Sequence, residues 1–392
     1  MKKRNLKGII NVFLLGVVSL VNDFSSEMIM PILPMFISAL GGGGLVIGLI
    51  AGLRESISSI LKVFFGYWSD KAGKRKIFIY SGYLTSSFFK LFLALSKTWQ
   101  HILVFAGLER IGKGLRSAAI DSVVAESMPK QKGEGFGIHR TLDTSGAILG
   151  SVAAFILFWF LGAEFKTIIL IAAVVSFFSL IPFYFVKERK RKPQNISLKI
   201  SLKELSKPLR AFILISGVFA LANFSYMFFI LRAQGIFTGR LAIGVPIFLY
   251  ILFNVFYAVF AVPFGVFSDK FGRKKTIILG YGLFSITCLG FIFFNSLTAF
   301  IVLFAVYGIV HALIEGNQRA YIADLSPEKL KATSLGTFHT TVGLAALPAS
   351  LIAGGLWQIN PNITFIYGAV IAAVPVVLFG IFRKYFKDEH SV

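Results

Sequence analysis

The sequence predicts an all-helical (all-α) membrane protein with twelve transmembrane helices, arranged as two related bundles of six. Three observations predict this fold: the composition, the distribution of basic residues and an internal repeat. Of the 392 residues, 56% are hydrophobic and only 15% are charged, and the mean hydropathy is +0.77. A soluble core could not bury that much apolar surface, so most of the chain is expected to lie in lipid. The composition argues against a soluble enzyme and against a nucleic-acid-binding module.

Each predicted span is a mostly apolar stretch of about 20 residues or more, the length that crosses the hydrocarbon core of a bilayer. The first stretch follows a basic N-terminus and lacks an A-x-A cleavage pattern, so we expect it to be retained. Stretches 99–127 and 297–325 carry internal charges, so hydropathy supports them least. The twelve stretches are 8–38, 44–68, 77–96, 99–127, 134–162, 166–186, 208–236, 241–267, 276–295, 297–325, 330–358 and 361–386.

The basic residues in the predicted loops lie almost entirely on one side of the membrane. The formal net charge is +22, and 28 of the 40 Lys and Arg residues fall in loops assigned to the cytoplasm, against 3 in the opposite loops. This positive-inside distribution places both termini in the cytoplasm and requires an even number of spans. It predicts a multi-pass protein of the cytoplasmic (inner) membrane, and it explains the basic charge without nucleic acid.

One loop pattern occurs twice at a fixed distance. The segment Gly66–Lys76 (GYWSDKAGKRK) recurs 199 residues later as Gly265–Lys275 (GVFSDKFGRKK). A fixed offset over half the chain indicates duplicated six-helix units. We therefore expect an N-terminal bundle at 1–186, a cytoplasmic linker at 187–207 and a C-terminal bundle at 208–392.

The repeated pattern, G-x-x-x-D-[KR]-x-G-[KR]-[KR], resembles the loop signature of the major facilitator superfamily (MFS), over essentially the full chain. The resemblance implies two six-helix bundles around a cavity that opens alternately to either side of the membrane. It also implies that Asp70, Lys71 and Arg75 help to latch the bundles together on the cytoplasmic side. Independently of the resemblance, Gly66 would let two helices approach closely and Gly73 would allow a tight reversal. The predicted cytoplasmic gate motif comprises Gly66, Asp70, Lys71, Gly73, Arg75, Gly265, Asp269, Gly272 and Arg273.

Ionisable side chains near the centre of a bilayer cost several kcal/mol each, so they usually mark function or a buried partner. Asp23 and Glu27 are four residues apart and share one helix face. They are candidates for proton binding, for structural ion pairs with a base in 99–127, or for substrate contact. Pro31 and Pro34 follow, so the helix is expected to bend beyond them.

The stretch 99–127 carries a second group of charges. Arg110, in the segment Arg110–Gly114 (RIGKG), resembles the helix-four arginine motif of the family, which implies proton transfer beside an acid of the first helix. Glu109, Lys113 and Arg116 share one face and are substrate-cavity candidates. Lys113 departs from the uncharged residue of the motif, and it either lines the cavity or reaches towards the membrane interface.

The second half offers its own candidates. His311, Glu315 and Arg319 follow at four-residue spacing on one face of the tenth span. His311 and Glu315 are expected to shuttle a proton or to contact substrate, and Arg319 to line the cavity. Three further residues are cavity candidates: Asn22, Asn223 and Tyr226.

Gly146 and Gly150 in the fifth span form a G-x-x-x-G face for close packing. The surrounding segment resembles the antiporter motif of the family, but Ser151 stands where that motif has proline. This departure weakens a prediction of export by antiport. The sequence from Asn22 to Glu27 nevertheless looks similar to bacterial exporters of the drug- and metal-resistance type.

The predicted function is secondary active transport of a small molecule or ion by alternating access. We expect coupling to protons and slightly favour efflux over uptake. The alternative is a transporter-like receptor or lipid-handling protein without gradient coupling. No P-loop and no metal-ligand spacing occur in the sequence, so we expect no cofactor, no metal and no enzymatic activity. The protein is expected to be a monomer, and the charge of the substrate is left open.

Overall fold

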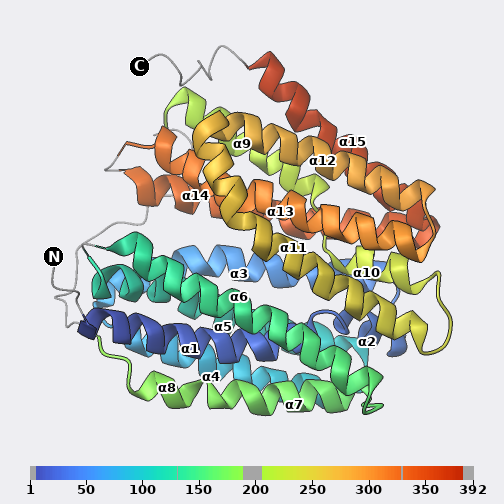
Figure 1. Ribbon diagram of the computed structural model, residues 1–392, viewed down its shortest axis with the longest axis horizontal. Coiled ribbons are helices and arrows are strands. Elements are labelled where there is room, and N and C mark those ends of the chain that lie inside the picture. Colours follow the sequence, from blue (N-terminus) through green and yellow to red (C-terminus); the bar gives the residue numbers. More distant parts are fainter. Residues whose placement is uncertain (1–5, 130, 189–204, 328–329, 383–392) are drawn as a thin grey trace. The chain divides into compact units, whose positions relative to one another are not determined.

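The computed structural model describes residues 6–129, 131–188, 205–327 and 330–382, and within these ranges it contains fifteen helices and no strands (Figure 1). The predicted all-helical fold class is confirmed. The helices are α1 (Leu6–Ile29), α2 (Leu33–Ala39), α3 (Gly44–Ala72), α4 (Arg75–Ala94), α5 (Trp99–Ser127), α6 (Lys132–Trp159), α7 (Phe165–Phe178), α8 (Leu180–Tyr184), α9 (Lys207–Ala222), α10 (Met227–Gln234), α11 (Leu241–Phe271), α12 (Arg273–Phe293), α13 (Leu297–Leu325), α14 (Lys331–Ile359) and α15 (Pro361–Ile381).

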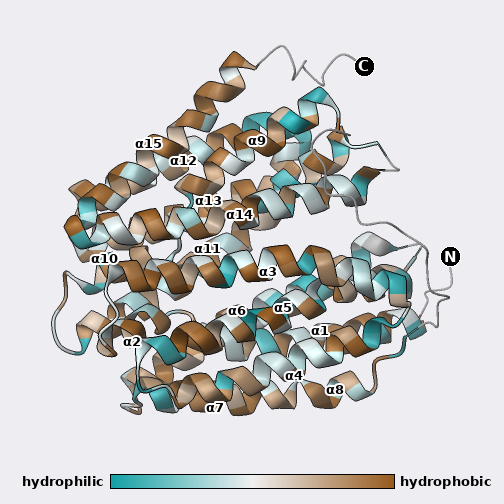
Figure 2. Ribbon diagram, turned by 180° about the vertical axis from the view of Figure 1, so that it is seen from behind, coloured by the Kyte–Doolittle hydropathy of each residue, from teal (hydrophilic) through white to brown (hydrophobic). Residues whose placement is uncertain are grey.

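Twelve long helical segments occupy the positions that the sequence predicts. Three of them are interrupted: α1 with α2, α7 with α8, and α9 with α10. Eleven segments of the described chain are long and apolar enough to cross a membrane, and Figure 2 shows hydrophobic residues along most of α7, α12 and α15. The remaining segment is α5, whose charged residues lower its hydropathy. This is one of the two spans that the sequence marks as least apolar.

Two of the interruptions lie beside predicted site residues. Helix α1 ends at Ile29, and α2 begins at Leu33 with Pro34 in its first turn. Pro31 lies between them, where it removes a backbone donor and disfavours helical geometry in the residue before it. The chain therefore breaks at the first proline rather than beyond the second. The other interruption separates α9 from α10 at residues 223–226.

The chain divides into two compact units. Unit 1 comprises Met1–Gly41 and Ile57–Leu198, and unit 2 comprises Gly42–Ser56 and Lys199–Val392. Helix α3 therefore contributes its first turns to unit 2 and the rest to unit 1. The sequence-based boundaries at 1–186 and 208–392 stay a prediction. Most of the predicted linker (187–207) lies outside the described residues, as do the basic residues before position 6, at 130 and 329, and after 382.

Unit 1 is organised around two closely packed helix pairs, α1 with α6 and α4 with α5. In α6, a Cβ atom added at Gly146 or at Gly150 would clash with the backbone carbonyl of Leu20 or Phe24 in α1. Only glycine permits this approach of the two backbones, so the predicted G-x-x-x-G packing face is confirmed. Helix α7 completes the unit by packing against both α1 and α4.

Unit 2 has a core that is rich in aromatic rings. Its main helix contacts are α11 with α13, α12 with α13 and α15, and α9 with α14 and α15. The rings of Phe219 and Tyr281 stack with centroids 4.0 Å apart, and those of Phe229 and Tyr307 stack at 4.3 Å. Such pairs add to the stabilisation from buried area alone.

The α1–α6 packing generates the first prediction. Gly150→Ala should destabilise the protein by about 1–3 kcal/mol, because the added methyl group must push α6 away from the backbone of α1. Gly137→Ala, on the same helix with no atom within 4 Å of the added Cβ, is the matched control. It should be neutral or stabilising by up to about 1 kcal/mol. Thermal unfolding in detergent checks both, and equal effects of the two substitutions would contradict the packing.

Candidate functional site

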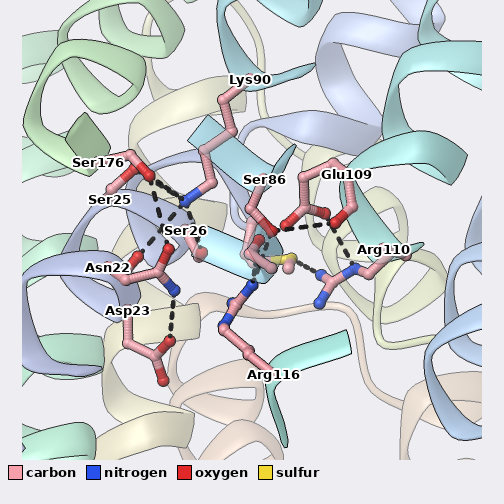
Figure 3. Close-up of polar contacts among 12 residues, drawn as sticks. Asn22, Asp23, Ser25, Ser26, Ser86, Lys90, Glu109, Arg110, Arg116 and Ser176 are labelled. Carbon is pink, nitrogen blue, oxygen red and sulfur yellow. Dashed lines mark hydrogen bonds and ion pairs between the residues drawn. The ribbon is translucent and has the colours of Figure 1, made fainter. Parts of the chain in front are cut away.

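The candidate site of unit 1 is centred on two acidic side chains from neighbouring helices. The carboxyl groups of Asp23 in α1 and Asp143 in α6 lie close enough to interact with each other, and both residues are only partly exposed. The glycines that follow Asp143 bring the helices close enough for this contact. Asn22 donates from Nδ2 to Oδ1 of Asp23 at 3.2 Å (Figure 3). The sequence singles out Asp23 but gives no sign that its partner is Asp143.

Cationic groups surround this acidic pair. Arg140 binds Asp143 with an Nη1–Oδ2 distance of 3.1 Å, although its side chain is 55% exposed. Lys113 and Arg116 of α5 lie near enough to Asp23 to interact electrostatically with it. The pair therefore lies among charges that can compensate a change in its own charge.

Glu27 lies one turn after Asp23 on α1 and is partly buried. Its main-chain carbonyl accepts a hydrogen bond from the hydroxyl of Ser151 in α6 at 3.5 Å. The carboxyl group that lies close to that of Asp23 from a neighbouring helix is that of Asp143, whereas the sequence places Asp23 and Glu27 on one face of α1.

Arg110 and Glu109, adjacent on α5, form an ion pair with an Nε–Oε2 distance of 3.3 Å. Both residues are buried. The guanidinium of Arg110 also reaches the sulfur of Met30 at 3.6 Å, at the break between α1 and α2 (Figure 3). Arg110 therefore contacts the first span through Met30, and its proton transfer beside an acid of that span stays a prediction.

Arg116 belongs to α5, and its side chain contacts α4. Its Nη1 donates to the hydroxyl of Ser86 at 2.6 Å, and its guanidinium carbon lies 4.7 Å from the centroid of the Tyr83 ring. The residue is 5% exposed. As a candidate for contact with substrate it is therefore less suitable than Lys113, which is exposed.

Lys90 of α4 is the main polar residue of unit 1 that the predicted site omits. It is 1% exposed, and its Nζ lies 2.9 Å from the Ser26 hydroxyl and 3.0 Å from the Ser25 hydroxyl. Its Nζ also donates to the hydroxyl of Ser176 in α7 at 3.3 Å (Figure 3). The sequence signal that could have identified Lys90 is a lysine within an apolar span, together with serines in other spans of the same unit.

Unit 2 brings together the polar residues that the sequence predicts on α13. His311 Nδ1 lies 3.3 Å from Glu315 Oε1, and Arg319 Nη2 lies 4.0 Å from Glu315 Oε2. The hydroxyl of Tyr257, from α11, donates to Glu315 at 2.8 Å. The sequence-based prediction does not include Tyr257, which comes from a different helix of the unit.

Asn223 and Tyr226 lie at the interruption between α9 and α10. The Asn223 amide N–H bonds back to the carbonyl of Phe219, at the end of α9. The ring centroid of Tyr226 lies 5.3 Å from that of Tyr250 in α11. The two residues therefore occupy a non-helical segment within a predicted span, a feature typical of binding sites in transporters.

The repeated loop motifs form one ionic cluster in each unit. Arg75 binds Asp70, with an Nη2–Oδ1 distance of 2.5 Å, and also Glu126 at the end of α5. Arg273 binds Asp269, with an Nη2–Oδ1 distance of 3.0 Å, and also Asp324 at the end of α13. Each arginine therefore ties the loop to another helix of its own unit. The predicted latch between the bundles stays a prediction.

The glycines of these motifs have different roles. Gly73 and Gly272 adopt positive φ angles of 64° and 100°, so the predicted tight reversal at Gly73 is confirmed. A Cβ at Gly66 would lie 2.8 Å from the Ala118 side chain, which confirms its predicted close packing, whereas Gly265 has nothing within 4 Å. Lys71 lies with its Nζ 5.8 Å from the centroid of the Tyr67 ring.

The sequence profile described as Major Facilitator Superfamily matches residues 15–248 and again residues 214–391. The chain belongs to the major facilitator superfamily. A relative of MFS type is the uncharacterized MFS-type transporter MJ1317 of Methanocaldococcus jannaschii, which is 56% identical over 94% of this chain and 94% of its own length. The predicted family is thus confirmed, and this MFS protein is a membrane transporter by family.

More distant comparisons add a functional name and the fold. The multidrug resistance protein MdtG of Salmonella paratyphi C is 29% identical over 41% of each chain, which agrees with the predicted likeness to resistance exporters. The crystal structure of the POT family transporter PepTSo superposes with a TM-score of 0.80 at 14% identity, covering 96% of this chain and 99% of that one. Nucleoside transporter NupG superposes with a TM-score of 0.77 at 14% identity, covering 97% of this chain and 100% of that one. At this identity the two structures support the fold alone.

The ionic clusters generate the second prediction. Arg75→Met should destabilise the protein by about 3 kcal/mol or more, because it leaves the carboxylates of Asp70 and Glu126 without their shared cation. The Arg75 side chain is only 9% exposed. Lys62→Met removes a more exposed ion pair with Asp121 (3.6 Å), and it should cost less than about 1 kcal/mol. Thermal unfolding of both variants checks the difference, and an equal loss would show that the cluster adds nothing beyond a surface pair.

Proposed function

We propose that this MFS protein is a proton-coupled secondary transporter in which Asp23 and Asp143 hold the coupling proton between them. The observation that carries the proposal is the closeness of their carboxyl groups, which lie near enough to interact with each other. Because an ionised carboxylate can only accept hydrogen bonds, two of them this close repel each other unless a proton lies between them. A pair of this kind binds and releases its proton as one unit.

The surroundings support reversible proton binding. When the proton leaves, the pair gains a negative charge, which Arg140 and Lys113 are placed to compensate. Both cations are exposed, so they can change partners at little cost. In this proposal Asp23 is the proton-coupling residue that the sequence predicts, and Asp143 replaces Glu27 as its partner.

The cluster of unit 2 supplies the second part of the proposal. Glu315 receives hydrogen bonds or ionic contacts from Tyr257, His311 and Arg319. A carboxylate that contacts a phenol, an imidazole and a guanidinium can exchange one of them for a substrate group or a proton. We assign this cluster to substrate contact or to a second protonation step.

The proposed transport is export of a small solute by alternating access across the cytoplasmic membrane. The partial match to MdtG, whose name denotes multidrug resistance, supports efflux over uptake. The distribution of basic residues supports cytoplasmic positions for both termini. We propose that a monomer carries out the cycle.

The third prediction tests the coupling. A thermal-shift screen of detergent-purified protein first identifies a compound that binds. Accumulation of that compound in proteoliposomes with an imposed pH gradient should then fall at least about tenfold in Asp23→Asn and in Asp143→Asn, because neither variant can hold the shared proton. Exchange of the compound without a gradient should persist in both.

Asp121→Asn is the matched control, since Asp121 is an acid of the same unit whose side chain is 53% exposed and pairs with Lys62. It should leave gradient-driven accumulation unchanged. Full accumulation in Asp23→Asn would refute the role of the pair. Binding without any flux in the native protein would favour instead a receptor or lipid-handling protein.

A further inference from the structure

Lys90 ends in a cage of oxygen atoms from two neighbouring helices. The cage consists of the hydroxyls of Ser25 and Ser26 in α1, the hydroxyl of Ser176 in α7 and the main-chain carbonyl of Asn22, which lies 3.4 Å from Nζ. Ser25, Ser176 and Asn22 are all buried, as is Lys90 itself. The amino group therefore joins α4 to the last turns of α1 and to α7.

The cage contains no acidic group. Within the described residues, no carboxylate lies within ion-pair distance of Lys90 Nζ, so its contacts are hydroxyl and carbonyl oxygens alone. Burying an amine without an acidic partner costs free energy, and a methionine of similar length would fill the same space at less cost. The energetic cost indicates a role beyond packing. The position beside the C-terminal turns of α1 does favour a cation, because the helix dipole is negative there.

A chain of hydrogen bonds leads from Lys90 to the proposed coupling site. Lys90 donates to the Ser176 hydroxyl at 3.3 Å, and with the Ser87 hydroxyl (2.7 Å away) also donating to it, the Ser176 hydroxyl donates to Oδ1 of Asn22 at 3.5 Å. The Nδ2 of Asn22 then donates to Asp23 at 3.2 Å (Figure 3). Every donor in the chain points towards Asp23, and an amide whose oxygen accepts a hydrogen bond becomes a stronger donor through its nitrogen.

We propose that Lys90 is a positioning residue of the coupling site, which acts through Ser176 to orient Asn22 towards the carboxyl group of Asp23. The inference rests on the proposed function, because it assigns Lys90 a role in proton binding by the Asp23–Asp143 pair. Lys90 does not touch the pair itself. Its hydrogen bonds hold the Asn22 amide in the one orientation that donates to Asp23.

Other titratable groups also surround the coupling site and Lys90, and none of them is substituted in the test variants. Those around Asp23 are Asp143 and His139 from α6, Lys113 and Arg116 from α5, and Tyr83 from α4. Those around Lys90, besides Asp23, are Glu109, Arg110 and Arg116, all from α5.

The fourth prediction uses infrared spectroscopy of protein reconstituted in lipid, titrated with pH. The carboxyl band that Asp23→Asn removes reports protonation of the pair. Ser176→Ala removes the hydroxyl that links Lys90 to the Asn22 amide, while Lys90 keeps its contacts with Ser25, Ser26 and the Asn22 carbonyl. The midpoint of the band should move to higher pH by roughly half a unit, because a weaker donor stabilises the Asp23 carboxylate less. Lys90→Met should move it in the same direction by roughly one unit.

Ser179→Ala is the matched control. Ser179 is also a fully buried serine, three residues further along, but its hydroxyl bonds to the main-chain carbonyl of Ser176 and not to the chain. The midpoint of the carboxyl band in Ser179→Ala should equal that in the native protein. If Lys90→Met does not fold, Ser176→Ala decides alone.

The outcomes separate the two proposals. Equal midpoints in Ser176→Ala and Ser179→Ala would overturn the role of Lys90 while leaving proton binding by the pair intact. A native protein without any pH-dependent band that requires Asp23 would overturn the proposed function as well.

Discussion

The close approach of α1 and α6 is the constraint on which the polar interior of unit 1 depends. Gly146 and Gly150 leave no room for a side chain against the backbone of α1, so the helices meet near backbone contact. Asp143 lies one turn before these glycines, and at that helix separation its carboxyl group lies close to that of Asp23. Two acids in such contact must hold a proton or meet a cation, and the nearby Arg140 and Lys113 offer the second possibility. The same close packing of α1 against α6 therefore both stabilises unit 1 and brings the two acids of the site together.

The two units use the repeated sequence differently. At the loop motifs they agree, since Arg75 and Arg273 each bind the aspartate of the motif and an acid at the end of another helix. In the interior they differ. Unit 1 places Lys90 of α4 against hydroxyl groups of α1 and Arg116 of α5 against a hydroxyl of α4, whereas unit 2 surrounds Glu315 and His311 with the rings of Tyr257, Phe253 and Tyr307. The two units thus share their loop clusters and differ in their interiors.

The sequence predicts the features that depend on local geometry. Span positions follow from hydropathy, the tight turn at Gly73 from glycine chemistry, and the grouping of His311, Glu315 and Arg319 from four-residue spacing on one helix. It does not predict Asp143 as the partner of Asp23, the oxygen cage of Lys90 or the contact of Tyr257 with Glu315. Each of these depends on which helix faces which, and periodicity identifies a face without identifying its neighbour. For the same reason the sequence does not predict Glu126 and Asp324 as ion-pair partners. Each binds an arginine of the gate motif from a distant part of the chain.

The most direct test of the central claim counts protons. If Asp23 and Asp143 share one proton, purified native protein should release one proton more between about pH 5 and pH 9 than Asp23→Asn, measured with a pH-indicator dye. Asp143→Asn should lose the same single proton, and the double variant should lose no more than either single variant. Independent, additive losses in the two single variants would show that each carboxyl group titrates alone, and they would contradict the shared-proton pair.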